Sequence, residues 1–427
     1  MSATAVQNKL ALLGGEPCVT GDHRELFHWP IVTQEHEDAV LEVLRSGRMS
    51  AWDITQEFEA EFADYVGTRY ALASPNGTAS LIEAMFGCKV GRGDEIIAPS
   101  MTFWSTALPA FNLGATPVFA DIEPDSLCID PNDIEHRITE RTKAIIPVHY
   151  CGHPADMDPI MEIARRHGVK VIEDVSHAQG GFYKGRKVGT FGDVGAMSMM
   201  SGKSFAIGEA GMLCTDDQEI YERAVSFGHY EQTGTKLTLP DLKPWIGVPV
   251  GAYKNRLNQL NSAMGRVQLK LYPNKIQEIQ DAMNYFWDEL EGLPGIRAHR
   301  PPEDSGSTMA GWYASTGLYV PEELGGLPVS KFREAVSAEG SRCGRGCNNP
   351  LHLHHVLNEA DLYGDGKPTR IAFADRDLRQ PAGSLPVTEA LPERCYSVPW
   401  FKHDRRDEID QYVAAFRKVI EQADQLL

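Results

Sequence analysis

Lys203 stands among small residues in the stretch Ser201-Gly202-Lys203-Ser204. A lysine in a Gly-Lys-Ser stretch can hold a phosphate in a Walker A loop, or it can attack a carbonyl carbon as an amine nucleophile. The Walker A pattern requires a glycine at position 197, where this chain has Met197. The residues that follow Lys203 are also a poor start for the helix that such a loop opens. The sequence therefore favours a nucleophilic lysine over an ATP-binding one.

Several other residues could act with such a lysine, and they follow short apolar runs. They are Gly77 and Thr78 in the stretch Asn-Gly-Thr-Ala-Ser, the neighbours Phe103 and Trp104, Asp174 with His177 three positions later, and Ser198 five positions before Lys203. Pyridoxal phosphate needs amides and hydroxyls for its phosphate, a carboxylate for its ring nitrogen and an aromatic neighbour for its ring face. His177 could also bond the ring hydroxyl. The set therefore predicts a pyridoxal-phosphate site.

Each of these residues also has an ordinary structural explanation. Gly-Thr-Ala after a strand is a common helix cap, and a carboxylate often ends a strand. Phe and Trp side chains in such positions more often belong to the core than stack on a cofactor, and a single histidine in a loop is usually a polar residue exposed to solvent. For each residue alone the structural explanation is preferred. Their combination, in this order along the chain, favours the cofactor.

Seven short apolar runs separate helical patterns of 10–15 residues between positions 68 and 217. The strand-like runs are RYALAS, DEIIAPS, TPVFADIE, RTKAIIPVHY, VKVIEDVSH, VGAMSMM and AGMLCTDD. Alternation of this kind is typical of βαβ units and of a mainly parallel sheet. Ligands of such sheets lie beyond the carboxyl ends of the strands, where Asp174 and Ser198 stand. Residues 156–168 and 106–114 are predicted as two of the intervening helices.

Three parts of the chain are predicted from these patterns. Residues 1–50 form an N-terminal tail and a helix, residues 51–275 a large cofactor-binding α/β domain, and residues 276–427 a smaller α+β domain. A long helix is expected over 257–295, linking the two domains. The stretch 341–390, rich in Gly, Arg, Asn and Asp, has no assignable pattern.

The chain resembles the DegT/StrS-type aminotransferases, which are fold-type I pyridoxal-phosphate enzymes. The resemblance rests on NGTAS, on GDEIIAPSMTFWSTALPAFNLGATPVFADIEPDS, on PVHYCGHPADMDPI, on IEDVSHAQGG and on the Lys203 motif that ends in Gly208-Glu209-Ala210-Gly211. It extends from about residue 10 to 275. It implies that Lys203 forms the Schiff base and that Asp174 pairs with the pyridine nitrogen. It also implies that Phe103 stacks on the ring, that Gly77, Thr78 and Ser198 hold the phosphate, and that His177 faces the ring hydroxyl.

The family forms homodimers in which a loop of the partner subunit completes each site. That loop usually carries Asn-x-Arg, whereas here Lys254 occupies the asparagine position and Asn255 precedes Arg256. Two alternatives follow: Lys254 acts as a point charge on the phosphate, or Asn255 reaches it. Ala210 replaces a family glycine, and Met199-Met200 replaces Phe-His.

The resemblance implies amino transfer from glutamate or glutamine to a keto sugar, usually nucleotide-linked, or to a keto cyclitol. A sugar dehydratase or an epimerase is the nearest alternative, although family dehydratases replace the lysine by histidine. A non-catalytic regulator that binds the cofactor is another alternative. Arg256, Arg342, Arg345 and Leu-His-Leu-His-His at 351–355 are candidates for a nucleotide's diphosphate, with solvated surface as the equal explanation.

The composition of the chain excludes some classes of binding partner and predicts a cellular compartment. The formal net charge of −18 argues against nucleic acid and anionic membranes as partners, since both require a basic face. No apolar run reaches the roughly 18 residues of a membrane-spanning helix. Eight scattered cysteines without a zinc pattern, and an N-terminus without signal-peptide features, predict a cytoplasmic protein with reduced thiols.

Overall fold

The computed structural model describes residues 9–427 and contains the predicted seven-stranded sheet. In spatial order its strands are β1 Tyr70–Ser74, β9 Gly211–Thr215, β8 Val194–Ser198, β5 Lys170–Asp174, β4 Thr142–Ile145, β2 Glu95–Pro99 and β3 Thr116–Ala120. Only β9 runs against its neighbours; the other six strands share one direction. The fold class predicted from the sequence is therefore confirmed.

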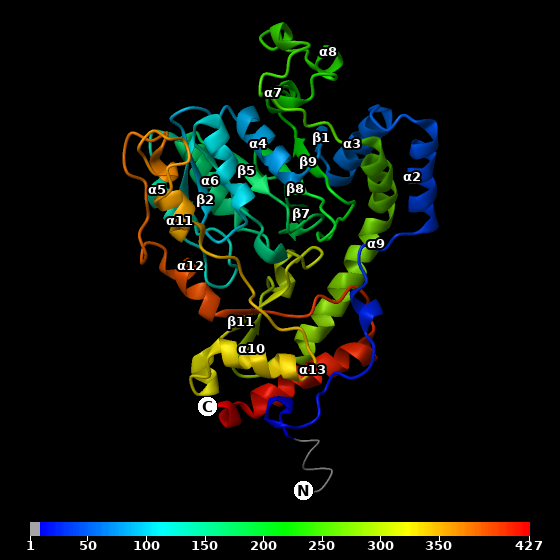
Figure 1. Ribbon diagram of the computed structural model, residues 1–427, viewed down its shortest axis with the longest axis vertical. Helices are drawn as coiled ribbons and strands as arrows, with labels where there is room; N and C mark the ends of the chain where they lie inside the picture. The colour runs from blue at the N-terminus through cyan, green and yellow to red at the C-terminus, as the bar shows by residue number, and fades with distance from the viewer. Residues whose placement is uncertain (1–8) are drawn as a thin grey trace.

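Helices cover both faces of this sheet, and two hydrophobic cores lie between helices and sheet (Figure 1). The helices on or beside the sheet are α2 Gln34–Ser46, α3 Asp53–Val66, α4 Gly77–Gly87, α5 Pro131–Arg137, α6 Met157–His167, α7 Gln218–Gly228 and α8 Thr233–Lys236. In α6 the buried residues Met157, Ile160 and Ala164 recur at helical spacing. The helix ends at Gly168, whose φ of 67° favours glycine.

The predicted helix over 106–114 is wrong. The structure forms two 3₁₀ segments there, Trp104–Thr106 and Leu108–Leu113. Pro109 lacks the backbone N–H that a continuing α-helix would need, and Gly114 at φ 77° ends the segment. The chain therefore passes through this stretch in tighter turns than an α-helix makes.

A second, smaller sheet is antiparallel and consists of β10 Ile296–Ala298, β11 Thr316–Tyr319 and β12 Cys395–Ser397. Helices α10 Val329–Ala338 and α13 Arg406–Glu421 pack with it around a third core. We call this assembly the small lobe, and the seven-stranded sheet with its helices the large lobe. The long helix α9, Gln259–Glu289, joins the lobes (Figure 1) and confirms the helix predicted over 257–295. Because α9 continues through residue 275, the domain boundary placed there stays a prediction.

The stretch without an assignable pattern covers the edge of the large sheet. It carries the short helices α11 His355–Asn358 and α12 Pro386–Ala390. Gln380 bonds both the N–H and the carbonyl of Phe119 in the edge strand β3, at 3.1 and 2.7 Å. These bonds satisfy backbone groups that an open sheet edge would expose. Figure 1 shows this orange segment beside α5 and α6 of the large lobe.

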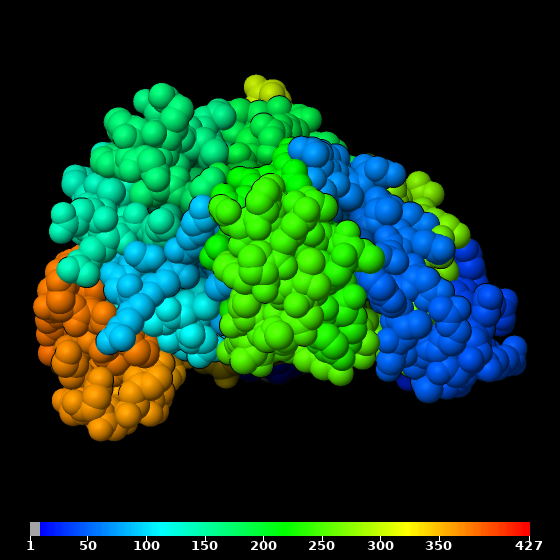
Figure 2. Space-filling model, turned by 90° about the horizontal axis from the view of Figure 1, so that it is seen from above, coloured from blue at the N-terminus to red at the C-terminus, as the bar shows by residue number. Residues whose placement is uncertain are grey.

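Two further features complete the large lobe. A short hairpin follows the loop after β5 and consists of β6 Phe182–Tyr183 and β7 Arg186–Lys187. The segment that carries α8 projects from the large lobe, and Figure 2 shows it in green at the centre of that face. Within residues 9–427 no helix is long and apolar enough to cross a membrane.

Candidate active site

A pocket of about 680 Å³ lies between the carboxyl edge of the large sheet and the small lobe. Seven of the nine predicted site residues line it: Gly77, Thr78, Phe103, Asp174, His177, Ser198 and Lys203. Strands β1, β2, β5 and β8 run in one direction, so the residues after them meet at the same edge of the sheet. The volume of the pocket, and the polar side chains that line it, are typical of a site that binds a small molecule.

The start of α4 forms one end of the pocket. Asn76 caps this helix, because its Oδ1 accepts the N–H of Ala79 at 2.9 Å. A Cβ added at Gly77 would lie 2.7 Å from the Cβ of Ser198, so only glycine allows α4 to approach β8 this closely. The free N–H groups of the first turn and the hydroxyls of Thr78 and Ser198 therefore gather at one point, which suits an anion.

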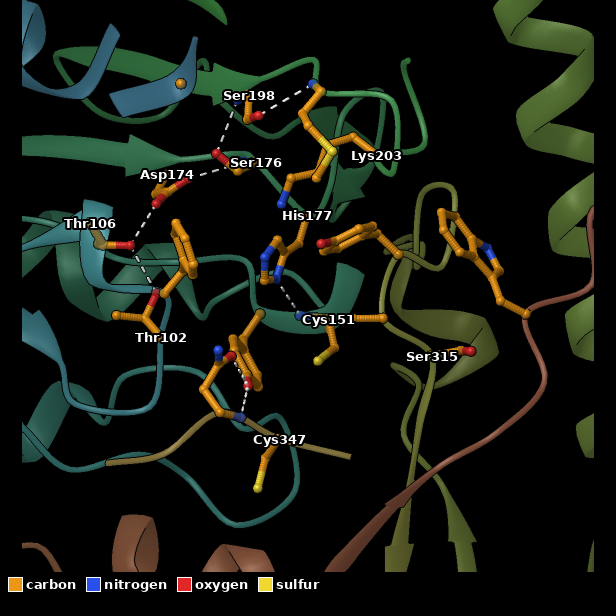
Figure 3. Close-up of a pocket in the computed structure, with 18 of the residues that line it drawn as sticks. Thr102, Thr106, Cys151, Asp174, Ser176, His177, Ser198, Lys203, Ser315 and Cys347 are labelled. Atoms are coloured by element: carbon orange, nitrogen blue, oxygen red, sulfur yellow. Dashed lines mark hydrogen bonds between the residues drawn. The ribbon is translucent and has the colours of Figure 1, made fainter. Parts of the chain in front are cut away.

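Asp174 ends β5 with its carboxylate held by two donors. Thr106 Oγ1 donates to Oδ2 at 2.8 Å, and the N–H of Ser176 donates to Oδ1 at 3.0 Å. Thr106 is itself bonded to Thr102 at 2.8 Å. The side chain is 3% exposed, so the carboxylate is fixed in one orientation inside the pocket (Figure 3).

His177 and Lys203 extend toward Asp174 in the same close-up (Figure 3). The N–H of Cys151 donates to His177 Nδ1 at 3.2 Å, so the neutral ring carries its proton on Nε2. Burial, together with the nearby charge of Lys203, holds the pKa of His177 well below its usual range. The neutral histidine can therefore act as a hydrogen-bond donor in the pocket.

The amine of Lys203 lies 3.9 Å from the centre of the Tyr313 ring, and the residue is 7% exposed. Burial lowers the pKa of this amine to about 8, although the charge of Asp174 opposes the shift. At neutral pH a far larger fraction of Lys203 is uncharged than of an ordinary lysine. An uncharged amine is the form that attacks a carbonyl carbon.

The uptake of pyridoxal phosphate by cofactor-free protein is therefore expected to depend on pH. Deprotonation of Lys203 produces the reactive amine, so the rate should rise with pH and level off above about pH 8. The rate of uptake is measured by stopped-flow recording of the visible absorbance band from pH 6 to pH 10. A rate that keeps rising through pH 10 would show an unperturbed lysine.

Phe103, rather than its neighbour Trp104, lines the pocket. Both side chains are almost half exposed, at 47% and 45%, and their ring centres lie 5.0 Å apart. The structure therefore favours Phe103, the residue that the resemblance implies, as the ring-stacking residue.

Lys254 and Asn255 lie outside this pocket within the protomer. Asn255 is 6% exposed and donates to Glu83 Oε1 at 2.9 Å, and His229 bonds the same oxygen at 2.7 Å. Lys254 is exposed, with its amine 5.8 Å from the Tyr230 ring centre. Their predicted contact with the site of a partner subunit stays a prediction.

The two methionines that replace the family's Phe-His separate in the structure. Met199 is fully buried in a core, whereas Met200 lines the pocket. Ala210 is buried as well, and its carbonyl accepts the N–H of Met199 at 2.8 Å. The change at position 200 is therefore the one that can alter the pocket.

Three functional candidates escaped the sequence analysis: Thr106, Tyr150 and Tyr313. Thr106 orients Asp174, and the rings of Tyr150 and Tyr313 flank His177 at 5.6 and 4.6 Å. Tyr313 comes from the small lobe, between Trp312 and Ala314, which both have positive φ. Tyr313 could not be identified from a local sequence pattern, because only the packing of the two lobes brings it close to Lys203.

Among the candidates for a nucleotide's diphosphate, Arg342 and Arg345 line the pocket. Arg256 instead pairs with Glu231 at 2.6 Å. His352 is buried between Ser100 and Glu389, so it belongs to the core.

Cys347, also in the pocket wall, has a pKa lowered to about 7 by a hydrogen bond from Cys395 and by the Arg345 guanidinium. Burial raises the pKa of six other thiols, and the hydrogen bond with Cys347, followed by burial, raises the pKa of Cys395. Iodoacetamide at pH 7.5 is therefore expected to label Cys347 first, because the thiolate is the reactive form. Peptide mapping by mass spectrometry measures the order of labelling. Faster labelling of Cys18 or Cys343, which are also partly exposed, would contradict the geometry.

Comparison with known proteins identifies the family. A sequence model of the DegT/DnrJ/EryC1/StrS aminotransferase family matches residues 30–417. The chain belongs to this family. The match continues into the small lobe, well beyond residue 275, where the resemblance of the sequence motifs becomes vague.

Individual relatives agree over nearly the whole chain. The spore coat polysaccharide biosynthesis protein SpsC of Bacillus subtilis (strain 168) is 31% identical, covering 93% of this chain and 97% of that protein. L-glutamine:scyllo-inosose aminotransferase of Streptomyces griseus is also 31% identical, covering 97% and 98%. The solved aminotransferase of Psychrobacter cryohalolentis superposes with a TM-score of 0.80 at 29% identity, covering 93% and 99%. The protein is therefore a pyridoxal-phosphate-dependent aminotransferase, as the sequence predicted.

Proposed function

We propose that this protein transfers an amino group from glutamate or glutamine to a keto sugar or a keto cyclitol, with pyridoxal phosphate held in the described pocket. The observation that carries the proposal is the meeting of Lys203, Asp174 and the start of α4 at one edge of the sheet. The Streptomyces griseus relative is named for an amino transfer to scyllo-inosose, which supports a cyclitol acceptor. A nucleotide-linked keto sugar is the second candidate, because Arg342 and Arg345 could bind its diphosphate.

The residues present fit the cofactor. The close approach of Gly77 to Ser198 brings the Ser198 hydroxyl to the start of α4, beside Thr78, and this end of the pocket suits the phosphate. The oriented carboxylate of Asp174 suits a protonated ring nitrogen, and Phe103 offers an aromatic face. The Nε2 proton of His177 suits the ring hydroxyl. The roles that the resemblance assigns to these residues are therefore proposed for this chain.

Bound pyridoxal phosphate supplies an electron sink that makes the α-proton of the amino donor acidic. Lys203 would hold the cofactor through its amine. When that amine is free, it would take the α-proton of the donor as a base and give a proton back as an acid. Its lowered pKa, about 8, suits both steps. Asp174 holds the proton on the ring nitrogen, and Thr106 holds Asp174.

We further propose a homodimer in which each site receives Lys254 from the partner. The segment around residues 246–253 exposes Ile246, Val248, Val250 and Tyr253, an apolar surface that suits a second copy of the chain. The segment belongs to the part of the chain around α8 that projects from the large lobe (Figure 1). Because Asn255 is buried against Glu83, the exposed amine of Lys254 is the better candidate for the partner's phosphate site.

A substrate panel tests the proposed function. The holoenzyme is mixed with glutamate or glutamine, and loss of the visible band reports the donor half-reaction. Keto cyclitols and nucleotide-linked keto sugars are then tested for return of the band. Unchanged absorbance with every donor would instead favour an epimerase, a dehydratase or a non-catalytic regulator.

A further inference from the structure

A glycine-rich loop of the small lobe, residues 340–348, carries Arg342 and Arg345 into the pocket wall. We call it the arginine loop. Its backbone is fixed to β12, since the N–H of Gly344 donates to Ser397 Oγ at 2.8 Å and the N–H of Ser397 donates to the Gly344 carbonyl at 2.9 Å. A Cβ at Gly346 would lie 2.6 Å from the carbonyl carbon of Tyr396. The loop is therefore clamped while its two long side chains project from it.

Neither guanidinium is neutralised by a carboxylate within residues 9–427. Arg345 Nη2 donates to the Asn348 carbonyl at 3.3 Å, and the Arg342 guanidinium lies 4.6 Å from the centre of the Phe27 ring. Both contacts orient the side chains and leave most of their N–H donors available. Arg345 also lies beside the Cys347 thiol, whose pKa it lowers. In a chain with a formal net charge of −18, two arginines without a carboxylate partner among the described residues make this pocket wall attractive to anions.

Short contacts connect the arginine loop with the reacting end of the pocket. Asn348, which accepts from Arg345, accepts from Tyr150 Oη at 2.7 Å and donates its N–H back to that hydroxyl at 3.0 Å. The Tyr150 ring lies 5.6 Å from the His177 ring. Arg345 is thus two residues removed from His177, on the small-lobe side. The proposed phosphate site of the cofactor lies on the large-lobe side, at α4.

We propose that Arg342 and Arg345 form an oxyanion subsite for the substrate, separate from the cofactor's phosphate site. Its ligand is the carboxylate of the amino donor or the phosphate of a nucleotide-linked acceptor. Planar guanidinium groups bind both anions through paired hydrogen bonds. The inference rests on the proposed function, because it assumes that the substrate reacts beside Lys203 and His177.

The test uses the holoenzyme and the double variant R342Q/R345Q, with R417Q as the matched control. Arg417 lies on α13 of the same lobe, outside the pocket, and donates to the Glu289 carbonyl at 2.7 Å, so R417Q removes a charge at a distance from the subsite. One arm measures binding of thymidine diphosphate by calorimetry. The other measures KM for glutamine, and for its α-amide, in the donor half-reaction.

Each charged hydrogen bond corresponds to roughly a 10- to 100-fold change in affinity. We expect the double variant to weaken thymidine diphosphate binding by that factor if the anion is the acceptor's phosphate. If it is the donor's carboxylate, KM for glutamine should rise by that factor while KM for its α-amide stays unchanged. R417Q should stay within about 2-fold of wild type in both arms.

The assignment is overturned if a donor bleaches the visible band of the wild-type holoenzyme but the double variant matches wild type in both arms. Failure of the proposed function gives a different result: no donor changes the visible band of the wild-type holoenzyme. Equal melting temperatures of the two variants exclude unfolding as the cause.

Discussion

Replacing Lys203 by alanine is expected to abolish amino transfer and the visible absorbance band together. The substitution removes both the covalent attachment of the cofactor and the only amine that lines the pocket, among the residues described. A turnover loss of at least roughly 10⁴-fold is expected, since nucleophilic attachment and proton transfer are lost at once. Turnover and the absorbance spectrum of the purified variant are the measurements.

K184A is the control for this variant. Lys184 is an exposed lysine that pairs with Asp158 on the surface. It should retain wild-type activity and colour. An active K203A protein would end the proposed mechanism, whereas an inactive K184A protein would point to general damage of the fold.

Replacing Asp174 by asparagine is expected to lower kcat by roughly 10²- to 10³-fold, because the charge that keeps the ring nitrogen protonated is lost. Asparagine has nearly the same shape and can still accept the Ser176 N–H, so the cofactor should still bind. Steady-state kinetics and the absorbance spectrum separate these two effects. D158N, which alters an exposed carboxylate, is the matched control. Wild-type kcat in D174N would remove Asp174 from the mechanism.

The fold of the large lobe could be predicted from the sequence because its strands and helices are marked by short, local residue patterns. Each strand is a short apolar run, and parallel strands gather their carboxyl ends at one edge. Asp174 and Ser198 could therefore be placed together without coordinates. The helix over 106–114 was predicted wrongly because its apolar residues suggested helical spacing, although Pro109 prevents a continuous α-helix.

The small-lobe wall of the pocket could not be predicted, because it depends on how the lobes pack. Tyr313 reaches Lys203 from a loop in which Trp312 and Ala314 have positive φ. Arg345 reaches the pocket on a loop clamped to β12. The stretch 341–390 showed no periodic pattern because it follows the edge and surface of the large sheet.

The central claim is a covalent bond between Lys203 and pyridoxal phosphate, and borohydride reduction tests it most directly. Protein supplied with the cofactor is reduced, digested and mapped by mass spectrometry. The account predicts one modified peptide, spanning Lys203, with the mass of the reduced pyridoxyl adduct. An unmodified Lys203, or an adduct confined to other lysines, would contradict it.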